Sequence, residues 1–340
     1  MRIKMKIKWC VIGAGGIADR RTIPAIIEDQ GSELVAVMDM VAETAERVGK
    51  KYGVKYFTNE EEMLKSVDCD AVYIGTPVFS HYEQAMTALA FGKHVFVEKP
   101  IAMTVKEGEE LVNAFKKAGK MLNVGYMMKY HNLHEKAKEI IADGGIGGVN
   151  SIRAQFTCWY PDIPGAWRQN KALGGGGAIM DLGVHCIELV EYLLDDEIET
   201  VKAIYSTKTF NYEVEDGAVI IFKTSKGVLG HIDVNFNVPD NASVSKLELY
   251  GDKGYIYCEG TLAQEEKGKL SHLYSPQGDY VAQQNRTTDK PQEYFGQESN
   301  LYLKQIKAFR ELVQAQTLDY FYVERAVQVQ KVVEKIYNEN

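Results

Sequence analysis

The chain has 340 residues, of which 45% are hydrophobic and 25% are charged, and its formal net charge is −8 at pH 7. This composition is typical of a globular protein and excludes disordered and fibrous classes, while the length predicts two cores, because single cores stop growing near about 250–300 residues. The acidic balance argues against a nucleic-acid or anionic-membrane partner, since such surfaces are bound through Lys and Arg.

Cysteine usage and the length of the apolar runs bear on the compartment. Five cysteines are scattered along the chain, without a CxxC pair or a Cys/His spacing that would hold zinc. We therefore expect a reducing compartment, the cytoplasm. No run of about 18 apolar residues occurs, so we also expect no membrane span.

The first third of the chain alternates short apolar runs with amphipathic segments. The runs cover residues 8–13, 34–39, 71–75 and 94–97 and are bounded by Gly, Asp or Pro, as buried parallel strands are. Helical periodicity covers 17–28, 42–52, 60–65, 81–91 and 105–118. This alternation predicts a doubly wound parallel sheet of the Rossmann kind over residues 1–125.

A glycine-rich turn follows the first predicted strand and opens the first predicted helix. It is a G-x-G-x-x-A run, from Gly13 to Ala18. The first glycine permits a tight turn, the second lets a pyrophosphate approach the main chain, and the small last residue allows close packing of helix on strand. A plain turn is the alternative, but strand, glycines and helix together predict a dinucleotide site that includes Gly13, Gly15, Gly16 and Ile17.

The second predicted strand ends at Asp39, where a carboxylate can accept both ribose hydroxyls of an adenosine and would repel a 2′-phosphate. Met40 follows, and no Arg or Lys occurs before Arg47. We therefore expect NAD rather than NADP, with Asp39 and Met40 beside the cofactor. A solvated aspartate at a strand end is the alternative.

The third predicted strand runs into Thr76 and Pro77, and His81 opens the next helix. A loop at the carboxyl end of a strand beside the switch point is where the nicotinamide end of a dinucleotide is expected. We therefore count Thr76, Pro77 and His81 as candidate cofactor contacts, although His81 could equally be only a helix-start residue.

A charged pair, Glu98 and Lys99, follows the fourth apolar run directly, and Pro100 fixes the turn. In a functional interpretation Lys99 enters the cleft as a cation, hydrogen-bonds a substrate hydroxyl and lowers the pKa of that hydroxyl. A surface ion pair at a turn is the alternative. We favour the functional interpretation and count both residues as candidates.

From about Gly148 the pattern becomes one of strands at hairpin distances, over 150–160, 200–209, 217–224, 228–237, 243–250 and 254–259, separated by turn signals. One strong helix is predicted at 178–194, and two more close the chain at 298–315 and 322–338. We therefore predict an α+β domain over 126–340, built on a large, mainly antiparallel open sheet. Its final helix could pack back on the first domain, and residues 264–300 are the least determined.

The second domain supplies its own candidates. Asp181 and His185 lie four residues apart on the predicted helix, after a run of four glycines, and therefore share a face. A carboxylate and an imidazole at this spacing suit proton transfer, with the imidazole titrating near neutral pH. A metal site is the competing idea, but no third ligand at a suitable spacing supports it, and we expect no metal. A purely structural pair is a further alternative.

These motifs, in this order, resemble the glucose–fructose oxidoreductase, inositol dehydrogenase and MocA (Gfo/Idh/MocA) family over nearly the whole chain. They are GAGGIA, Asp39, the GTP segment with His81, EKP, and the sequence from Trp167-Arg168 through the glycines to Asp181 and His185. The resemblance implies an NAD(P)-dependent oxidoreductase that acts on sugars or cyclitols, with an N-terminal Rossmann domain. It also implies a C-terminal sheet that often forms the interface of a homodimer or homotetramer.

Carried over to this sequence, the resemblance implies that Lys99 contacts the substrate hydroxyl and the nicotinamide ribose, that Asp181 binds substrate and that His185 is catalytic. It makes the Lys99–Pro100 peptide bond a candidate for the cis form. Two departures are Val78, where the family often has Asn, and the segment from Tyr126 to Tyr130, where Lys129 is the one cation although many members carry Arg. The second departure weakens the case for a strongly anionic substrate.

The predicted reaction is reversible hydride transfer between nicotinamide C4 and a ring carbinol carbon. His185 would remove the hydroxyl proton, Lys99 would stabilise the developing alkoxide and Asp181 would hold substrate and imidazole in place. Tyr126, Trp167 and Arg168 are further candidate substrate contacts, and Trp159 and Tyr160 add aromatic faces that suit a sugar ring. Two rivals stay open: an NAD-dependent glycoside-cleaving enzyme that oxidises its substrate transiently, and a non-enzymatic NAD-responsive sensor.

Overall fold

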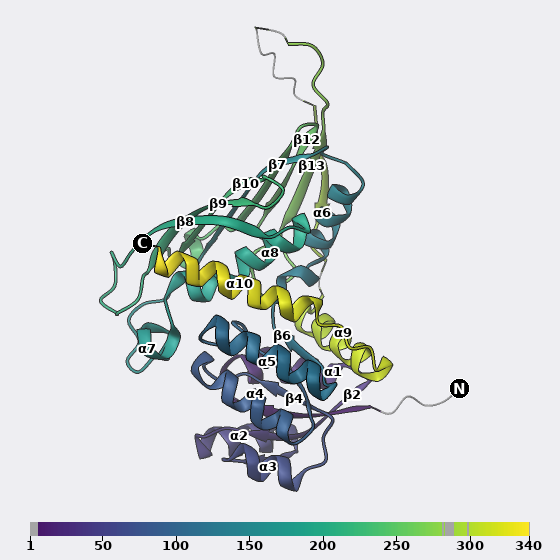
Figure 1. Cartoon of the computed structure of the whole chain (residues 1–340), viewed down its shortest axis with the longest axis vertical. Coiled ribbons are helices and arrows are strands. Elements are labelled where there is room, and N and C mark those ends of the chain that lie inside the picture. The colour runs from purple at the N-terminus through teal and green to yellow at the C-terminus, as the bar shows by residue number, and fades with distance from the viewer. Residues whose placement is uncertain (1–5, 281, 283–288, 298, 340) are drawn as a thin grey trace. The chain divides into compact units, whose positions relative to one another are not determined.

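The computed structural model describes residues 6–280, 282, 289–297 and 299–339 (Figure 1). The chain divides into two compact units. The first comprises the described residues up to Tyr126 together with Ala172–Gly175 and Tyr302–Lys331. The second comprises Met127–Lys171, Gly176–Leu301 and the described residues from Val332 onward.

The first unit is built on a six-stranded parallel sheet in the order β3-β2-β1-β4-β5-β6. This is the strand order of a Rossmann sheet, in which the order reverses between β1 and β4. The strands are β1 (Ile7–Ile12), β2 (Ser32–Met38), β3 (Lys55–Phe57), β4 (Ala71–Ile74), β5 (His94–Val97) and β6 (Leu122–Val124). The helices between them are α1 (Ile23–Glu28), α2 (Ala42–Tyr52), α3 (Glu60–Ser66), α4 (His81–Ala90) and α5 (Val105–Ala118).

The apolar runs identified in the sequence form the central strands because both faces of these strands are covered. All four residues of β4 are buried, as are all but one in β1 and in β5. The predicted fold class is confirmed. Two three-residue strands at the edges, β3 and β6, were not predicted. β3 has two exposed residues out of three, so it carries no apolar run to detect.

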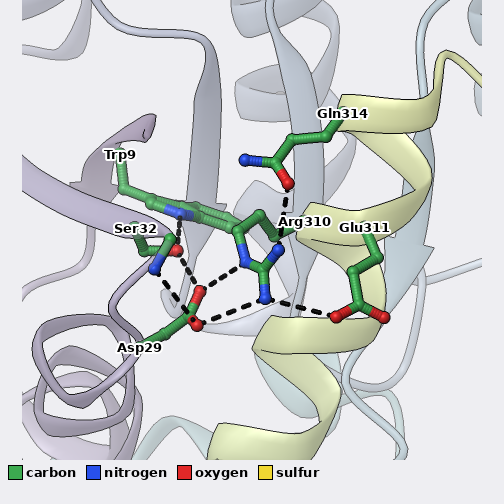
Figure 2. A network of polar contacts seen from close by, with 7 residues as sticks. Trp9, Asp29, Ser32, Arg310, Glu311 and Gln314 are labelled. Carbon is green, nitrogen blue, oxygen red and sulfur yellow. Dashed lines mark hydrogen bonds and ion pairs between the residues drawn. The ribbon is translucent and has the colours of Figure 1, made fainter. Parts of the chain in front are cut away.

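Helix α9 (Leu301–Ala315) packs on the core of the first unit. Phe309 of this helix contacts the rings of Trp9 and Phe96, with ring centroids 5.3 and 5.4 Å apart. Arg310 of the next position bonds to Asp29, which follows α1 (Figure 2). The predicted closing helices are α9 and α10 (Phe321–Asn338), and α10 contributes residues to both units.

The second unit is built on an eight-stranded sheet in the order β14-β13-β12-β11-β7-β10-β9-β8. Neighbouring strands run antiparallel, except that β7 and β10 are parallel. The strands are β7 (Val149–Thr157), β8 (Ile198–Ser206), β9 (Gly217–Thr224), β10 (Leu229–Asn235), β11 (Lys246–Gly251), β12 (Gly254–Glu259), β13 (Lys269–Tyr274) and β14 (Gln292–Phe295). The helices are α6 (Asn132–Ala142), α7 (Lys171–Gly174) and α8 (Val184–Leu194), and Figure 1 shows α6 and α8 beside the sheet.

The predicted large, mainly antiparallel sheet is confirmed, and the helix predicted at 178–194 is present in two parts. A π-helical turn covers Ile179–Gly183 and α8 continues from Val184. A second π-helical turn, Ala18–Thr22, precedes α1 in the first unit. Periodicity did not reveal either turn, because one extra residue per turn shifts a pattern only locally. Strands β13 and β14 fall in the segment that the sequence left undetermined.

Candidate active site

The glycine-rich turn between β1 and the first helical turn has the conformation that its sequence predicts. Gly13 and Gly16 have positive φ angles of 78° and 52°. A Cβ on Gly13 would lie 2.7 Å from both the main-chain N and Cγ2 of Thr76, so only glycine fits there. A Cβ on Gly16 would have no heavy atom within 4 Å. The main chain at Gly16 therefore borders open space at a helix start, where a phosphate can be bound.

Asp39 lies beside this turn, directly after β2. Its carboxylate accepts hydrogen bonds from the main-chain N–H groups of Gly15, at 3.1 Å, and Val41, at 3.0 Å. The side chain of Met40 is 83% exposed. Arg47, the first cation after Asp39 in the sequence, is paired at 2.7 Å with Asp19. The glycine turn and Asp39 are thus joined by a hydrogen bond, at the two positions where a Rossmann unit binds the pyrophosphate and the adenosine ribose of a dinucleotide.

His81 is buried at the start of α4, and its ring lies between two main-chain carbonyl groups. Nδ1 is 2.8 Å from the oxygen of Pro100, and Nε2 is 3.0 Å from the oxygen of Thr76. The imidazole thus connects the loop after β4 to the turn after β5. Thr76 itself donates its hydroxyl to Gln84 of α4, at 2.6 Å. Pro77 is partly exposed in the same loop.

The Glu98–Lys99–Pro100 turn follows β5, and the Lys99–Pro100 peptide bond is cis. Glu98 accepts a hydrogen bond of 2.7 Å from the hydroxyl of Tyr73 in the neighbouring strand β4. Burial, together with the charge of Glu98, holds the pKa of Tyr73 well above its ordinary value, so this hydroxyl stays a donor. Lys99 is partly exposed. Tyr73 could not be identified from the sequence, because it is one residue of a strand that is buried throughout.

The candidates of the second unit gather at the start of the α8 helix. Asp181 lies in the π-helical turn and His185 in the first turn of α8. The side chain of His185 is 6% exposed and its ring faces the edge of Phe156 in β7, with centroids 6.4 Å apart. Arg168 donates from Nε to Asp181 at 3.2 Å and lies over the ring of Trp167 at 4.3 Å. The structure therefore brings Trp167, Arg168 and Asp181 together.

Tyr160 adjoins the same group. Burial raises the pKa of Tyr160, Arg168 opposes this rise and the charge of Asp181 adds to it, so the phenol stays protonated at neutral pH. An aromatic cluster extends from it: the ring of Trp159, which is 42% exposed, packs on Phe210, and Phe210 packs on Tyr212. Tyr212 donates to the main-chain oxygen of Tyr160 at 3.3 Å. Sequence reasoning missed Phe210 and Tyr212, although the F-x-Y alternation there is a visible signal.

Two further residues from the segment after β6 are buried. Tyr126 is 2% exposed. Lys129 forms an ion pair of 2.9 Å with Glu188 of α8, and both side chains are almost fully buried. The positive charge of Lys129 is thus compensated inside the unit. Of the predicted residues, Lys99 belongs to the first unit and Asp181 and His185 to the second.

Among the described residues, no group of three or more His, Cys, Asp and Glu side chains could hold a metal ion. No helix in the described part of the chain is long and apolar enough to cross a membrane.

Comparison with known proteins gives matches over most of the chain. Residues 7–126 match the family described as "Oxidoreductase family, NAD-binding Rossmann fold", and residues 134–257 match the "GFO/IDH/MocA C-terminal domain". A 1,5-anhydro-D-fructose reductase from Ensifer adhaerens is 30% identical over 266 residues, which cover 78% of this chain and 79% of the relative. An inositol 2-dehydrogenase from Klebsiella pneumoniae is 29% identical over 259 residues, covering 74% and 73%.

A solved structure is similar over almost the whole fold. The aldose–aldose oxidoreductase from Caulobacter crescentus, complexed with glycerol, superposes with a TM-score of 0.86 at 25% sequence identity. The match covers 98% of this chain and 97% of that one.

Proposed function

Because this chain belongs to the Gfo/Idh/MocA family of NAD(P)-dependent oxidoreductases, we propose that it interconverts a ring hydroxyl and a ring ketone of a sugar or cyclitol. The observation that carries the proposal is the placement of Asp181 and His185 four residues apart at the start of one helical segment, with Arg168 of a separate turn bonded to Asp181. It places a compensated carboxylate and a buried imidazole within one helical turn. The relatives named above act on an anhydro sugar and on inositol, which supports the substrate class.

The first unit is the cofactor domain in this proposal. The main chain at Gly15 and Gly16 would hold the pyrophosphate, and Asp39 the adenosine ribose. Thr76, Pro77, His81 and Glu98 would border the nicotinamide end, and Ile17 and Met40 would flank the dinucleotide. When bound, the nicotinamide supplies or accepts the hydride, and the protein supplies orientation and electrostatics.

The remaining chemistry is acid–base chemistry by side chains of this chain. The imidazole of His185 takes the proton from the substrate hydroxyl during oxidation and returns it during reduction. The ammonium of Lys99 donates a hydrogen bond to the same oxygen and stabilises its negative charge as the proton leaves. Asp181, itself held by Arg168, binds a neighbouring hydroxyl and orients the ring. Tyr126 and Trp167 would border the substrate.

The charges favour a neutral substrate. Lys129 is neutralised by Glu188, and Arg168 is neutralised in large part by Asp181. A polyanion would therefore meet two cations, Lys129 and Arg168, that already have a carboxylate partner. The aromatic faces of Trp167 and Tyr160 beside Arg168 instead suit the apolar face and the hydroxyls of a polyol ring.

The cofactor in this proposal is NAD rather than NADP. Asp39 is fixed by two N–H donors at the end of β2, where its charge would repel a 2′-phosphate. The nearest downstream cation, Arg47, is engaged by Asp19, and Met40 offers no hydrogen-bond donor. A 2′-phosphate would therefore meet one negative charge and no free cation in this segment.

The protein in this proposal is a homo-oligomer, a dimer or tetramer, associating through the outer face of the eight-stranded sheet. Strands β8 and β9 present exposed branched aliphatic side chains on that face. Ile204 is 84% exposed and pairs across the strands with Val219, and Ile221, two residues further along β9, is 58% exposed. Contiguous exposed apolar patches on a protein often form the surface through which it associates with another protein.

Two single substitutions test the reaction. We expect Lys99→Ala and His185→Ala each to lower kcat at least about 100-fold on the best sugar or cyclitol, in keeping with the usual worth of a general acid–base group. Binding of NAD, measured by fluorescence titration, should persist in both variants. Lys208→Ala and His231→Ala are matched controls with side chains outside both groups, and they should retain full turnover.

The product of the reaction separates the proposal from its rivals. A dehydrogenase accumulates one NADH per substrate oxidised, whereas transient oxidation releases an aglycone without net NADH. Near-normal turnover in both test variants would refute the assigned roles. Tight NAD binding without turnover across a panel of sugars, cyclitols and keto-sugars would point to a sensor instead.

A further inference from the structure

The start of the helix that carries Asp181 and His185 is held by one buried residue, Glu215. Its Oε1 atom accepts hydrogen bonds from the main-chain N–H groups of Gly177, at 3.0 Å, and Ile179, at 2.9 Å. The main-chain oxygen of Glu215 accepts from the N–H of Ala178, at 3.0 Å. The first N–H groups of a helix have no partner within the helix. Glu215 therefore satisfies three consecutive donors of this turn by itself.

A fourth donor comes from the end of the chain. The hydroxyl of Tyr337, in the last turn of α10, donates to the same Oε1 atom at 2.8 Å. Burial, together with the charge of Glu215, raises the pKa of Tyr337 well above its ordinary value, so this hydroxyl remains a donor. Glu215 is 6% exposed. Its negative charge lies at the positive end of the helix dipole, where a carboxylate is stabilised.

This contact explains two glycines of the run before the helix. A Cβ on Gly177 would lie 2.0 Å from the main-chain oxygen of Glu215, and a Cβ on Gly176 would lie 2.0 Å from the hydroxyl of Tyr337. A side chain at either position would push the helix start away from the carboxylate. The glycine run is thus shaped for the contact with Glu215 and Tyr337.

Glu215 is itself immobilised by its neighbour. Asp216 is fully buried, and its two carboxylate oxygens accept from the main-chain N–H groups of Lys208, Thr209 and Phe210 at 2.6–3.1 Å. Strand β9 then begins at Gly217 and pairs with β8 and β10. Glu215 and Asp216 therefore connect the helix start on one side and residues 208–210 on the other to strand β9, which is paired on both edges.

We propose that Glu215 is a positioning residue for the reaction, which acts through His185 by fixing the start of the helical segment that carries Asp181 and then His185. The inference rests on the proposed function, because it requires His185 to be the acid–base group. General acid–base catalysis depends on sub-ångström placement, and a displacement of about 1 Å can cost about 100-fold in rate. Loss of the carboxylate leaves two buried N–H groups and the Tyr337 hydroxyl without their acceptor, so the turn must move or admit water.

The test compares Glu215→Ala and Glu215→Gln in the wild-type and His185→Ala backgrounds. In the wild-type background we expect Glu215→Ala to lower kcat about 10- to 100-fold, with the KM for NAD unchanged. Glu215→Gln keeps a carbonyl acceptor and should restore kcat to within about threefold of the wild type, since it lacks only the charge. Glu199→Ala, an exposed carboxylate on β8, is the matched control and should change nothing.

The double variant separates positioning from general stability. If Glu215 acts through His185, Glu215→Ala lowers the residual single-turnover rate of His185→Ala less than twofold, because residues that act as a unit are not additive. An equal fold-loss in both backgrounds would overturn the inference. If Glu215→Ala does not fold, Tyr337→Phe, which removes one donor to Glu215, is compared in the same two backgrounds. A smaller fold-loss in the His185→Ala background would then support the inference, and an equal fold-loss in both would overturn it.

The failure of this inference can be distinguished from failure of the proposed function. Normal turnover in Glu215→Ala, beside a lost turnover in His185→Ala, would refute the positioning role alone. Normal turnover in His185→Ala would refute the acid–base assignment itself, and with it the route by which Glu215 is proposed to act.

Discussion

Replacement of Arg310 tests how helix α9 is held to the dinucleotide-binding unit. Arg310 donates to both carboxylate oxygens of Asp29, from Nε at 2.7 Å and from Nη2 at 3.3 Å (Figure 2). Ser32 also donates to Asp29, at 2.7 Å, and Trp9 donates to Ser32. The Asp29 side chain is 2% exposed and that of Arg310 is 13% exposed. The pair is therefore buried, bidentate and part of a network.

The expected loss in free energy of unfolding depends on which charged groups remain buried in each variant. Arg310→Met removes the cation but keeps most of the apolar stem, so Asp29 remains as a buried, unpaired carboxylate. Breaking a buried ion pair in this way costs about 3–5 kcal/mol, and the slight exposure of Arg310 places the expectation near the lower end, about 3 kcal/mol. Asp29→Asn combined with Arg310→Met removes both charges and should recover at least about half of that loss.

Trp9 provides the assay. It is fully buried in the first unit, against Phe309, whereas the other two tryptophans, Trp159 and Trp167, belong to the second unit. In a Trp159→Phe/Trp167→Phe background, urea unfolding followed by tryptophan emission therefore reports on the first unit alone. The midpoint shift multiplied by the denaturant slope gives the change in free energy of unfolding.

The pH dependence of this stability difference provides a second test, because the direction in which it changes is fixed by the pKa of Asp29. Burial alone would raise the pKa of Asp29, but the hydrogen bonds and charge of Arg310 and the bond from Ser32 outweigh burial and lower it. A lowered folded-state pKa stabilises the protein above the unfolded value of about 3.9 and ceases to do so as pH falls through the folded value. In Arg310→Met the lowering by Arg310 is gone, so the pKa of Asp29 is higher than in the wild type. The difference in stability between wild type and Arg310→Met should thus be constant while Asp29 is ionised in both proteins, and should shrink as pH falls from the higher pKa of the variant towards the lowered pKa of the wild type. A loss under about 1 kcal/mol at pH 7, or a difference unchanged in acid, would refute the reasoning.

Two further predictions concern the cofactor and the assembly. Asp39→Ser combined with Met40→Arg removes a charge that repels a 2′-phosphate and adds a charged donor. The ratio of kcat/KM for NADP to kcat/KM for NAD should therefore rise at least about 100-fold. An unchanged ratio would show that the 2′-position of the adenosine ribose does not lie beside these two residues. If the proposed oligomer forms through this face, Ile204→Lys combined with Ile221→Lys should give monomers in sedimentation velocity, because the double variant would bury two charges in an apolar interface. Ile27→Lys, at an exposed isoleucine of the first unit, is the control, and an unchanged mass in the double variant would exclude this face.

The sequence predicted the dinucleotide unit well because its signals are local. A strand buried on both faces must be apolar along its length. A tight turn directly after such a strand needs glycine, so the G-x-G-x-x-A run can be recognised without knowing its neighbours in the fold. The Asp181–His185 spacing was visible for the same reason. The short edge strands β3 and β14 were not visible, because exposed edges place no apolar requirement on their residues.

Residues whose roles depend on distant partners could not be predicted in this way. Lys129 looked like the one cation available to a substrate after β6, yet it pairs with Glu188, far along the chain. A signal did exist: Glu188 is flanked by apolar residues in a helix that is buried almost throughout, and a buried carboxylate is most often paired with a cation or with hydrogen-bond donors. Glu215 gave no such signal, since it stands between a polar loop and a strand and acquires its role only when the helix start folds against it.

Both glycine runs of the candidate site are followed by an irregular helical turn. A π-helical turn follows the run at Gly13–Gly16, and another follows the run at Gly174–Gly177 and contains Asp181. π-Helical turns are costly relative to α-helix and are found mostly at functional sites. Local rules are broken in proteins mainly where function requires it. In each unit the irregular turn follows directly on the glycines that admit a close partner, Thr76 in one case and Glu215 in the other. The π-helical turns thus coincide with two segments of the proposed chemistry, although the sequence arguments that located the chemistry made no use of helix geometry.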